Sequence, residues 1–150
     1  MPGGSYASNG QQYALASDLT GTIAAAALAH PSTNLAAQNA QLLRASEFMD
    51  GYFKDQYLLP LQTWGADVVD KCCEIAAYRL VRLRGFNPEA DGSYLTDYKM
   101  AIEWLESVAK GTISPDIVDA TPSPAPGTQT PAAAPSSYSP NCHTRGTRRR

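Results

Sequence analysis

Apolar residues recur along most of this chain at spacings of three and four, which is the period of an amphipathic helix. In the clearest case, Leu42, Ala45, Met49 and Tyr52 fall on one helical face. No segment alternates between apolar and polar residues for long enough to predict a strand. The pattern therefore predicts an all-α fold, a small bundle of about four helices over residues 17–30, 35–58, 64–84 and 93–110.

Local chemistry predicts where several of these helices begin and end. Thr63 is the expected N-cap of the third helix, and Asp91 or Ser93 is the expected N-cap of the fourth. Pro60 disfavours helical geometry in the residue before it. We therefore expect the second helix to end near Leu58.

Three glycines and two leucines near helix ends give further expectations. Gly85 and Gly111 follow the third and fourth helices, where glycine commonly ends a helix. Gly51 lies inside the second helix and costs about 1 kcal/mol relative to alanine, so we expect a neighbouring helix to pack closely against its bare backbone. The apolar stripes also place Leu35 and Leu83 on inward faces.

Composition divides the chain into three parts. Residues 1–12 are rich in glycine, serine, asparagine and glutamine and predict a flexible arm. Residues 13–117 carry the helical periodicity and predict one folded domain. Residues 118–150 predict an extended tail that is rich in proline, alanine and serine and ends in a basic segment.

Charge is divided between the body and this tail, although the formal net charge is only −2. Residues 1–119 hold all 14 acidic residues and eight basic ones, a balance of −6. An acidic body argues against a dedicated duplex-DNA binder, which needs a basic face. Residues 120–150 carry no acidic residue and four arginines, which either keep the tail soluble or dock it on an acidic protein surface or on DNA: Arg145, Arg148, Arg149 and Arg150.

The sequence contains no recognisable catalytic set, and it predicts no enzyme, no metal ion and no cofactor. His30 is expected to cap a helix end or face solvent, and His143 lies in the tail. An acidic stripe formed by Asp67, Asp70 and Glu74 is best interpreted as a solvated face or as a surface that meets a basic neighbour. A metal site at this stripe is the weaker alternative.

The three cysteines follow no metal-ligand or disulfide pattern. Cys72 and Cys73 are adjacent in a predicted helix, and we expect one of them in the core and the other at an interface. Cys142 lies beside His143, but two adjacent ligands are weak evidence for a tetrahedral metal site. The sequence also predicts no signal peptide and no membrane span.

Aromatic residues gather around the end of the second helix and in the third, where they either close the core or form an interface. A small core cannot hide five such side chains without their polar atoms reaching water or a partner. An apolar run, Leu58 to Leu61, accompanies them. Besides Tyr78, which belongs to the same group, the candidate interface residues are Tyr52, Phe53, Tyr57, Leu58, Leu59, Leu61 and Trp64.

An ordered series of short motifs extends across the helical region. It comprises Ala45-Ser46, Asp50-Gly51-Tyr52, Tyr57-Leu58-Leu59-Pro60-Leu61, Asp70, Ala76-Ala77-Tyr78, Leu80, Tyr98, Ala101-Ile102, Leu105 and Gly111. This series resembles the phage Mu gp36-like proteins, head–tail connector (neck adaptor) components of tailed phages. The resemblance covers roughly residues 13–117 and is weak before residue 40.

The resemblance implies a structural virion protein made in the host cytoplasm and located at the neck of the particle. It implies a homo-oligomeric ring, with 12 copies matching the portal, that extends the DNA channel and joins head to tail. The implied partners are the portal protein, a downstream neck or tail-completion protein, and packaged DNA that passes through the lumen without sequence-specific binding.

Two other interpretations stay open. One is a small helical regulatory module that binds another protein through the aromatic group and has no virion role. The other is an enzyme whose site forms only between subunits, with the acidic stripe as metal ligands.

Overall fold

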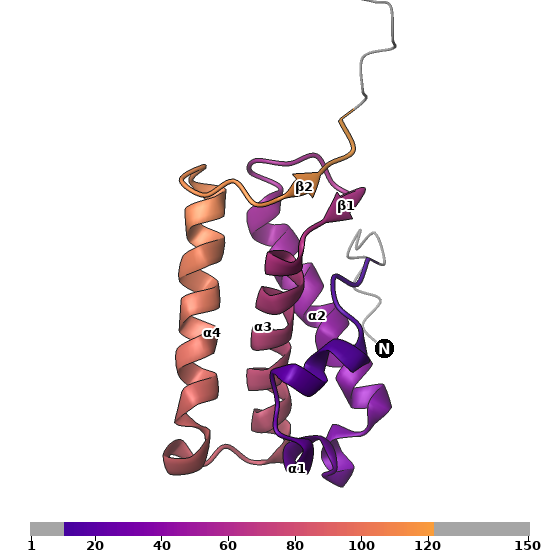
Figure 1. Ribbon diagram of the computed structural model, residues 1–150, viewed down its shortest axis with the longest axis vertical. Helices are drawn as coiled ribbons and strands as arrows, with labels where there is room; N and C mark the ends of the chain where they lie inside the picture. Colours follow the sequence, from indigo (N-terminus) through magenta and orange to yellow (C-terminus); the bar gives the residue numbers. More distant parts are fainter. Residues whose placement is uncertain (1–10, 122–150) are drawn as a thin grey trace, which may run out of the picture.

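The computed structural model describes residues 11–121, and their fold is the predicted all-α bundle (Figure 1). Three long helices pack together, and short helical turns lie on one side of them. The elements in order are η1 (Ala16–Gly21), α1 (Ala25–Leu28), η2 (Pro31–Thr33), α2 (Leu35–Phe53), β1 (Thr63–Trp64), α3 (Ala66–Arg84), α4 (Pro88–Ala109) and β2 (Ile117–Val118).

The core lies between α2, α3 and α4, with α3 in contact with both of the others. The apolar stripes of the three helices supply it, as their periodicity predicts. Side chains that are completely buried include Leu42, Ala45, Met49 and Phe53 from α2, Val68, Cys72, Ile75, Ala76 and Leu80 from α3, and Ala101, Leu105 and Val108 from α4.

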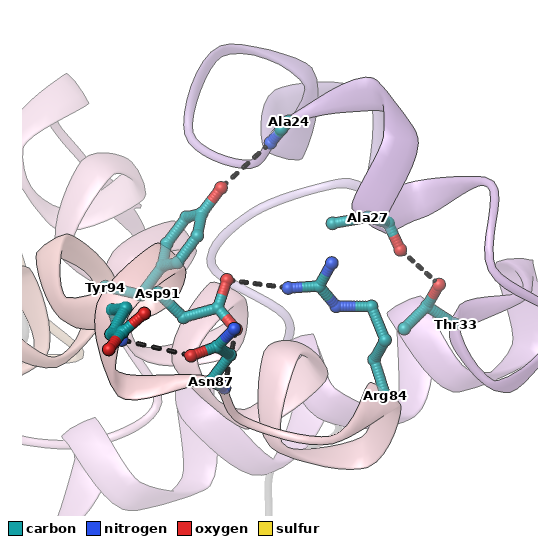
Figure 2. Close-up of polar contacts among 8 residues, drawn as sticks. Ala24, Ala27, Thr33, Arg84, Asn87, Asp91 and Tyr94 are labelled. Atoms are coloured by element: carbon teal, nitrogen blue, oxygen red, sulfur yellow. Dashed lines mark hydrogen bonds and ion pairs between the residues drawn. The ribbon is translucent and has the colours of Figure 1, made fainter.

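The single first helix expected over residues 17–30 is wrong, because the chain forms η1 and α1 with a break between them. Backbone groups in this region find partners outside their own helix. The Ala24 amide donates to the Tyr94 hydroxyl at 3.1 Å, and the Thr33 hydroxyl donates to the Ala27 carbonyl at 2.6 Å. Figure 2 shows both contacts, which tie the short helices to α4 and to each other.

Helix α2 ends at Phe53, not near Leu58 as Pro60 suggested. Beyond Phe53 the backbone turns, and the Leu58 amide and carbonyl are both used by a later part of the chain. The helix closes in a local turn, in which the Phe53 carbonyl accepts from the Gln56 and Tyr57 amides at 2.9 and 2.8 Å, before the proline is reached.

The expected caps of α3 and α4 are also wrong. Thr63 belongs to β1, and Gly65 is the N-cap of α3. Helix α4 begins at Pro88, with the Asn87 side chain accepting from the Glu89 amide at 3.1 Å. The two expected stops are confirmed, since Gly85 and Gly111 follow α3 and α4 with positive φ angles of 106° and 72°.

Asp91 lies inside α4 and is only 3% exposed. Its two carboxylate oxygens accept from an Arg84 guanidinium nitrogen at 2.6 Å and from the Asn87 amide at 2.9 Å. Figure 2 shows this clasp holding the loop between α3 and α4.

Three expectations about facing are wrong as well. Leu35 is 62% exposed and Leu83 is 50% exposed. Helical periodicity shows which face of a helix is apolar, but it does not show how far along the helix a neighbouring element covers that face. Gly51 faces open space, with no atom within 4 Å of the position that a Cβ would take. Close helix packing therefore does not explain this glycine.

We predict that Asp91→Ala lowers the free energy of unfolding by about 2–3 kcal/mol, because it leaves the partly buried Arg84 charge without its partner. Urea unfolding of the purified chain measures this change. The control is Glu89→Ala in the same helical turn, whose exposed side chain is expected to matter by less than about 0.5 kcal/mol. Equal losses in the two variants would contradict the role of the clasp.

Candidate assembly interface

The connection between α2 and α3, residues 54–65, closes one end of the bundle (Figure 1, top). Residues 116–120 lie along it, and we call them the C-terminal segment. Strands β1 and β2 pair antiparallel here, with Thr63 opposite Val118. Backbone hydrogen bonds join Gln62 to Val118 at 2.7 Å and Ala120 to Leu58 at 2.9 Å. We call this end of the molecule the corner.

A carboxylate fastens the C-terminal segment to the corner. Asp119 accepts from the Leu58 amide at 3.0 Å and from the Thr121 amide at 2.9 Å. Hydrogen bonds from Thr121 and then Leu58 favour the charged form, so the pKa of Asp119 lies below its ordinary value. The corner is therefore tied to the first residues of the predicted tail, 118–121.

Tyr13 holds the corner from its inner side. Its carbonyl accepts from the Trp64 indole nitrogen at 3.0 Å, and its amide donates to the Ser46 hydroxyl at 3.0 Å. Its ring meets Trp64 edge-on at 4.9 Å and Phe53 at 5.8 Å between ring centroids. Burial, followed by a hydrogen bond to Asp50, raises the pKa of Tyr13.

The structure divides the predicted interface residues. Phe53 and Leu61 are fully buried, so packing within the subunit accounts for them. Trp64 is partly buried against Tyr13, and Tyr57 lies edge-on to Phe53 at 6.2 Å. These four side chains mainly pack within the subunit and contribute little exposed surface at the corner.

Among the predicted interface residues at the corner, Leu58 is the most exposed, with 55% of its surface accessible, while Leu59 is partly buried. Sequence reasoning missed two exposed neighbours at this end, Val118 (55%) and Ile113 (38%). Neither belongs to a helical stripe, so no periodic signal marked them. Leu58, Ile113 and Val118 form what we call the apolar rim.

Two of the aromatics lie away from the corner. Tyr52 is partly buried and packs edge-on against Phe48 at 5.4 Å. Tyr78 stacks on Tyr98 of α4 with centroids 4.5 Å apart. The five aromatics therefore serve several contacts and do not form one cluster.

A hollow of about 190 Å³ lies beside the rim. It is lined by Gln56, Tyr57, Val108, Gly111, Ile113 and Ser114. The Gln56 side-chain amide donates to the Ala109 carbonyl at 3.0 Å and so joins the connection to the end of α4. The hollow is shallow and small, and it fits a protruding side chain better than a cofactor.

The cysteines lack the properties of catalytic nucleophiles. Both are buried, which overturns the expectation that one lies at an interface. Burial raises the pKa of Cys72 to about 11 and that of Cys73 to about 12. Both thiols therefore stay protonated at neutral pH.

The other candidate groups are placed as follows. His30 caps η2, with its Nδ1 accepting from the Ser32 amide at 3.2 Å, as a helix-end role predicts. Glu74 of the acidic stripe pairs with Lys71 at 2.9 Å. Within residues 11–121, no three His, Cys, Asp or Glu side chains converge to hold a metal ion.

Several predicted groups lie outside the described residues. They are most of the N-terminal arm (1–10), the pair Cys142 and His143, and the tail arginines Arg145, Arg148, Arg149 and Arg150. In the described part, no helix has the length and apolar character needed to cross a membrane.

The family model described as Bacteriophage Mu, Gp36 matches residues 13–133 of this chain. The chain belongs to this family. It is also similar to the Mu-like prophage FluMu protein gp36 of Haemophilus influenzae (strain ATCC 51907 / DSM 11121 / KW20 / Rd), with 39% identity over 75 residues. That alignment covers 50% of each chain, so the match spans half the length of the relative. The resemblance in the sequence is thus confirmed, and this Gp36 family member is a phage protein.

We predict that Asp119→Ala loosens the C-terminal segment of this Gp36 family member, because the Leu58 and Thr121 amides lose their acceptor. Amide hydrogen exchange should accelerate at Leu58 and Ala120 and stay unchanged in α3. Since the pKa of Asp119 is depressed, its contribution is present above the ordinary aspartate pKa of about 4 and is lost as pH falls through its lower folded value.

The matched control is Asp116→Ala, which changes the same residue type in the same segment but removes no side-chain hydrogen bond found in residues 11–121. Equal acceleration in both variants would mean that Asp119 does not fasten the segment.

Proposed function

We propose that this chain is a structural virion protein, a head–tail connector that forms a ring beneath the portal and extends the DNA channel into the tail. Membership of the bacteriophage Mu Gp36 family over residues 13–133 carries the proposal. The described domain supports it, because its apolar side chains either pack the core or form an exposed surface at the corner, and its cysteines are buried and protonated.

The corner is the surface that we assign to the contact with the portal or the next neck protein. Its apolar rim is exposed, yet the backbone beneath it is fixed by β1–β2 pairing, by Asp119 and by Tyr13. Apolar side chains on a fixed backbone lose little conformational freedom when a partner covers them. Such a surface suits a permanent joint between virion components.

The tail extends the same contact in this proposal. The described chain ends at Thr121, immediately after the segment that Asp119 fastens to the corner. The tail therefore starts beside the apolar rim. We assign its arginines, Arg145 and Arg148 to Arg150, to docking on the portal or a neighbouring subunit, because the body of this chain is acidic.

The acidic body also fits a channel that DNA passes through. With eight basic and 14 acidic residues, the part before residue 120 repels the DNA backbone and offers no basic face for duplex binding. A ring of copies, 12 where it matches the portal, then guides packaged DNA without sequence-specific contacts. The protein acts at the virion neck after synthesis in the host cytoplasm, and it catalyses no reaction.

We predict that Leu58→Asp combined with Val118→Asp prevents attachment of the ring to portal-bearing heads, because buried unpaired charge opposes apolar contact. Cryo-electron microscopy of the vertex measures ring occupancy, which should fall at least about ten-fold. The substitutions leave the core intact, so urea unfolding should show little change.

The control is Leu35→Asp, which charges an equally exposed leucine at the opposite end of α2 and should leave occupancy unchanged. Wild-type protein that never forms density at the vertex would refute the connector role and favour a regulatory module.

A further inference from the structure

A second surface, which shares no residue with the apolar rim, carries positive charge on this acidic domain. A hollow of about 280 Å³ lies between α2 and α3 and is lined by Gln41, Arg44, Arg79, Arg82 and Leu83. It holds three of the eight basic residues found before residue 120. We call it the arginine hollow.

Two of the three guanidinium groups of the hollow lie over aromatic rings, and none of the three forms an ion pair within residues 11–121. Arg79 lies over the Phe48 ring at 5.5 Å, and Arg82 lies over the Tyr78 ring at 5.8 Å. Within residues 11–121, the ion pairs involve other cations, namely Lys71, Arg84 and Lys110. These contacts hold the guanidinium groups of Arg79 and Arg82 in place while leaving their N–H donors available for an anionic partner.

A complementary surface surrounds the start of α3, and we call it the acid face. Asp67 and Asp116 both lie beside Gly65, where their atoms come within 2.8 and 3.3 Å of the position of a Cβ. Asp70 lies one turn after Asp67 on α3, and Asp18 belongs to η1, which contacts α3. None of these four carboxylates forms an ion pair with another described residue.

Asp70 of the acid face and Arg79 of the arginine hollow lie on opposite sides of α3. Asp70 and Arg79 are nine residues apart, which at 3.6 residues per turn is two and a half turns. A two-fold contact that joined hollow to hollow would bring like charges together. A head-to-tail contact instead brings the hollow of one copy to the acid face of the next.

We infer that the arginine hollow receives the acid face of a second copy of this chain, so that copies associate head to tail through α3. This inference rests on the proposed function and names the contact that builds its ring. Guanidinium groups bind carboxylates with two parallel hydrogen bonds, which fixes orientation as well as affinity. A second copy fits better than DNA, because the net charge of −6 around the hollow repels a phosphate backbone.

Charge reversal in the full chain tests the contact. One variant carries Arg79→Glu and Arg82→Glu, and another carries Asp70→Lys and Asp116→Lys. Sedimentation should show about 100-fold weaker association for each variant alone, because like charges then face each other. An equimolar mixture should restore association, since the reversed hollow of the first variant then meets the reversed acid face of the second.

The control variant, Lys54→Glu with Lys99→Glu, makes the same charge change as the arginine variant. Both positions are exposed and lie outside both surfaces, so the control should associate like the wild type. Raising salt from about 0.05 M to about 0.5 M should weaken wild-type association. The inference is overturned if the mixture is not restored, or if wild-type copies associate neither in solution nor on the portal vertex. Loss of DNA retention by the arginine variant with unchanged association would assign the hollow to DNA and also overturn it.

Vertex imaging separates this inference from the connector role. A wild-type ring that tolerates both reversals would overturn the head-to-tail contact and leave the connector role standing. A ring lost in each variant and regained in the mixture supports both.

Discussion

The fold depends on how the non-helical connection between α2 and α3 obtains its hydrogen bonds. Residues 54–65 leave the helical ladder at Phe53 and rejoin it at Ala66, so their backbone groups need partners from elsewhere. Both ends of the described chain supply them. The C-terminal segment pairs with Leu58, Gln62 and the β1 strand, and the Gln11 side-chain amide donates to the Leu61 carbonyl.

This arrangement explains why an apolar surface at the corner can be both exposed and well defined. An unpaired connection of this length would be free to fold its leucines into the core or to vary among conformations. Here Leu61 and Phe53 fill the core beneath, strand pairing fixes the backbone of Val118, and hydrogen bonds from Ala120 and to Asp119 fix that of Leu58. The surface assigned to virion assembly is thus a product of the same bonds that close the bundle.

The sequence predicted the three long helices well because their apolar period reflects one buried face, as Leu42, Ala45 and Met49 show. It predicted their ends less well, because distant hydrogen bonds decide them. Pro60 marked the end of α2 in sequence, yet the helix ends at Phe53, and Leu58 hydrogen-bonds instead to the C-terminal segment. Two-residue strands such as Thr63–Trp64 are too short to show any alternation.

The residues of the candidate site likewise divide into those that the local sequence predicts and those that only the fold brings together. Leu58 was found because it belongs to an apolar run, whereas Val118 belongs only to a short apolar pair with Ile117 and is brought to the connection by its pairing with Thr63. Tyr13 gave no periodic signal, although it joins the N-terminal segment, α2 and the corner. The arginine hollow joins Arg44 to Arg79 and Arg82, which are too far apart in the chain for a local motif.

The central claim is that the corner is the surface by which this protein joins the virion. Hydrogen–deuterium exchange of the full chain, free and bound to portal-bearing heads, tests it most directly. The account predicts that binding slows exchange most in residues 57–64 and 113–121, which carry the apolar rim. Unchanged exchange at the corner, with protection confined to other parts of the bound chain, would contradict it.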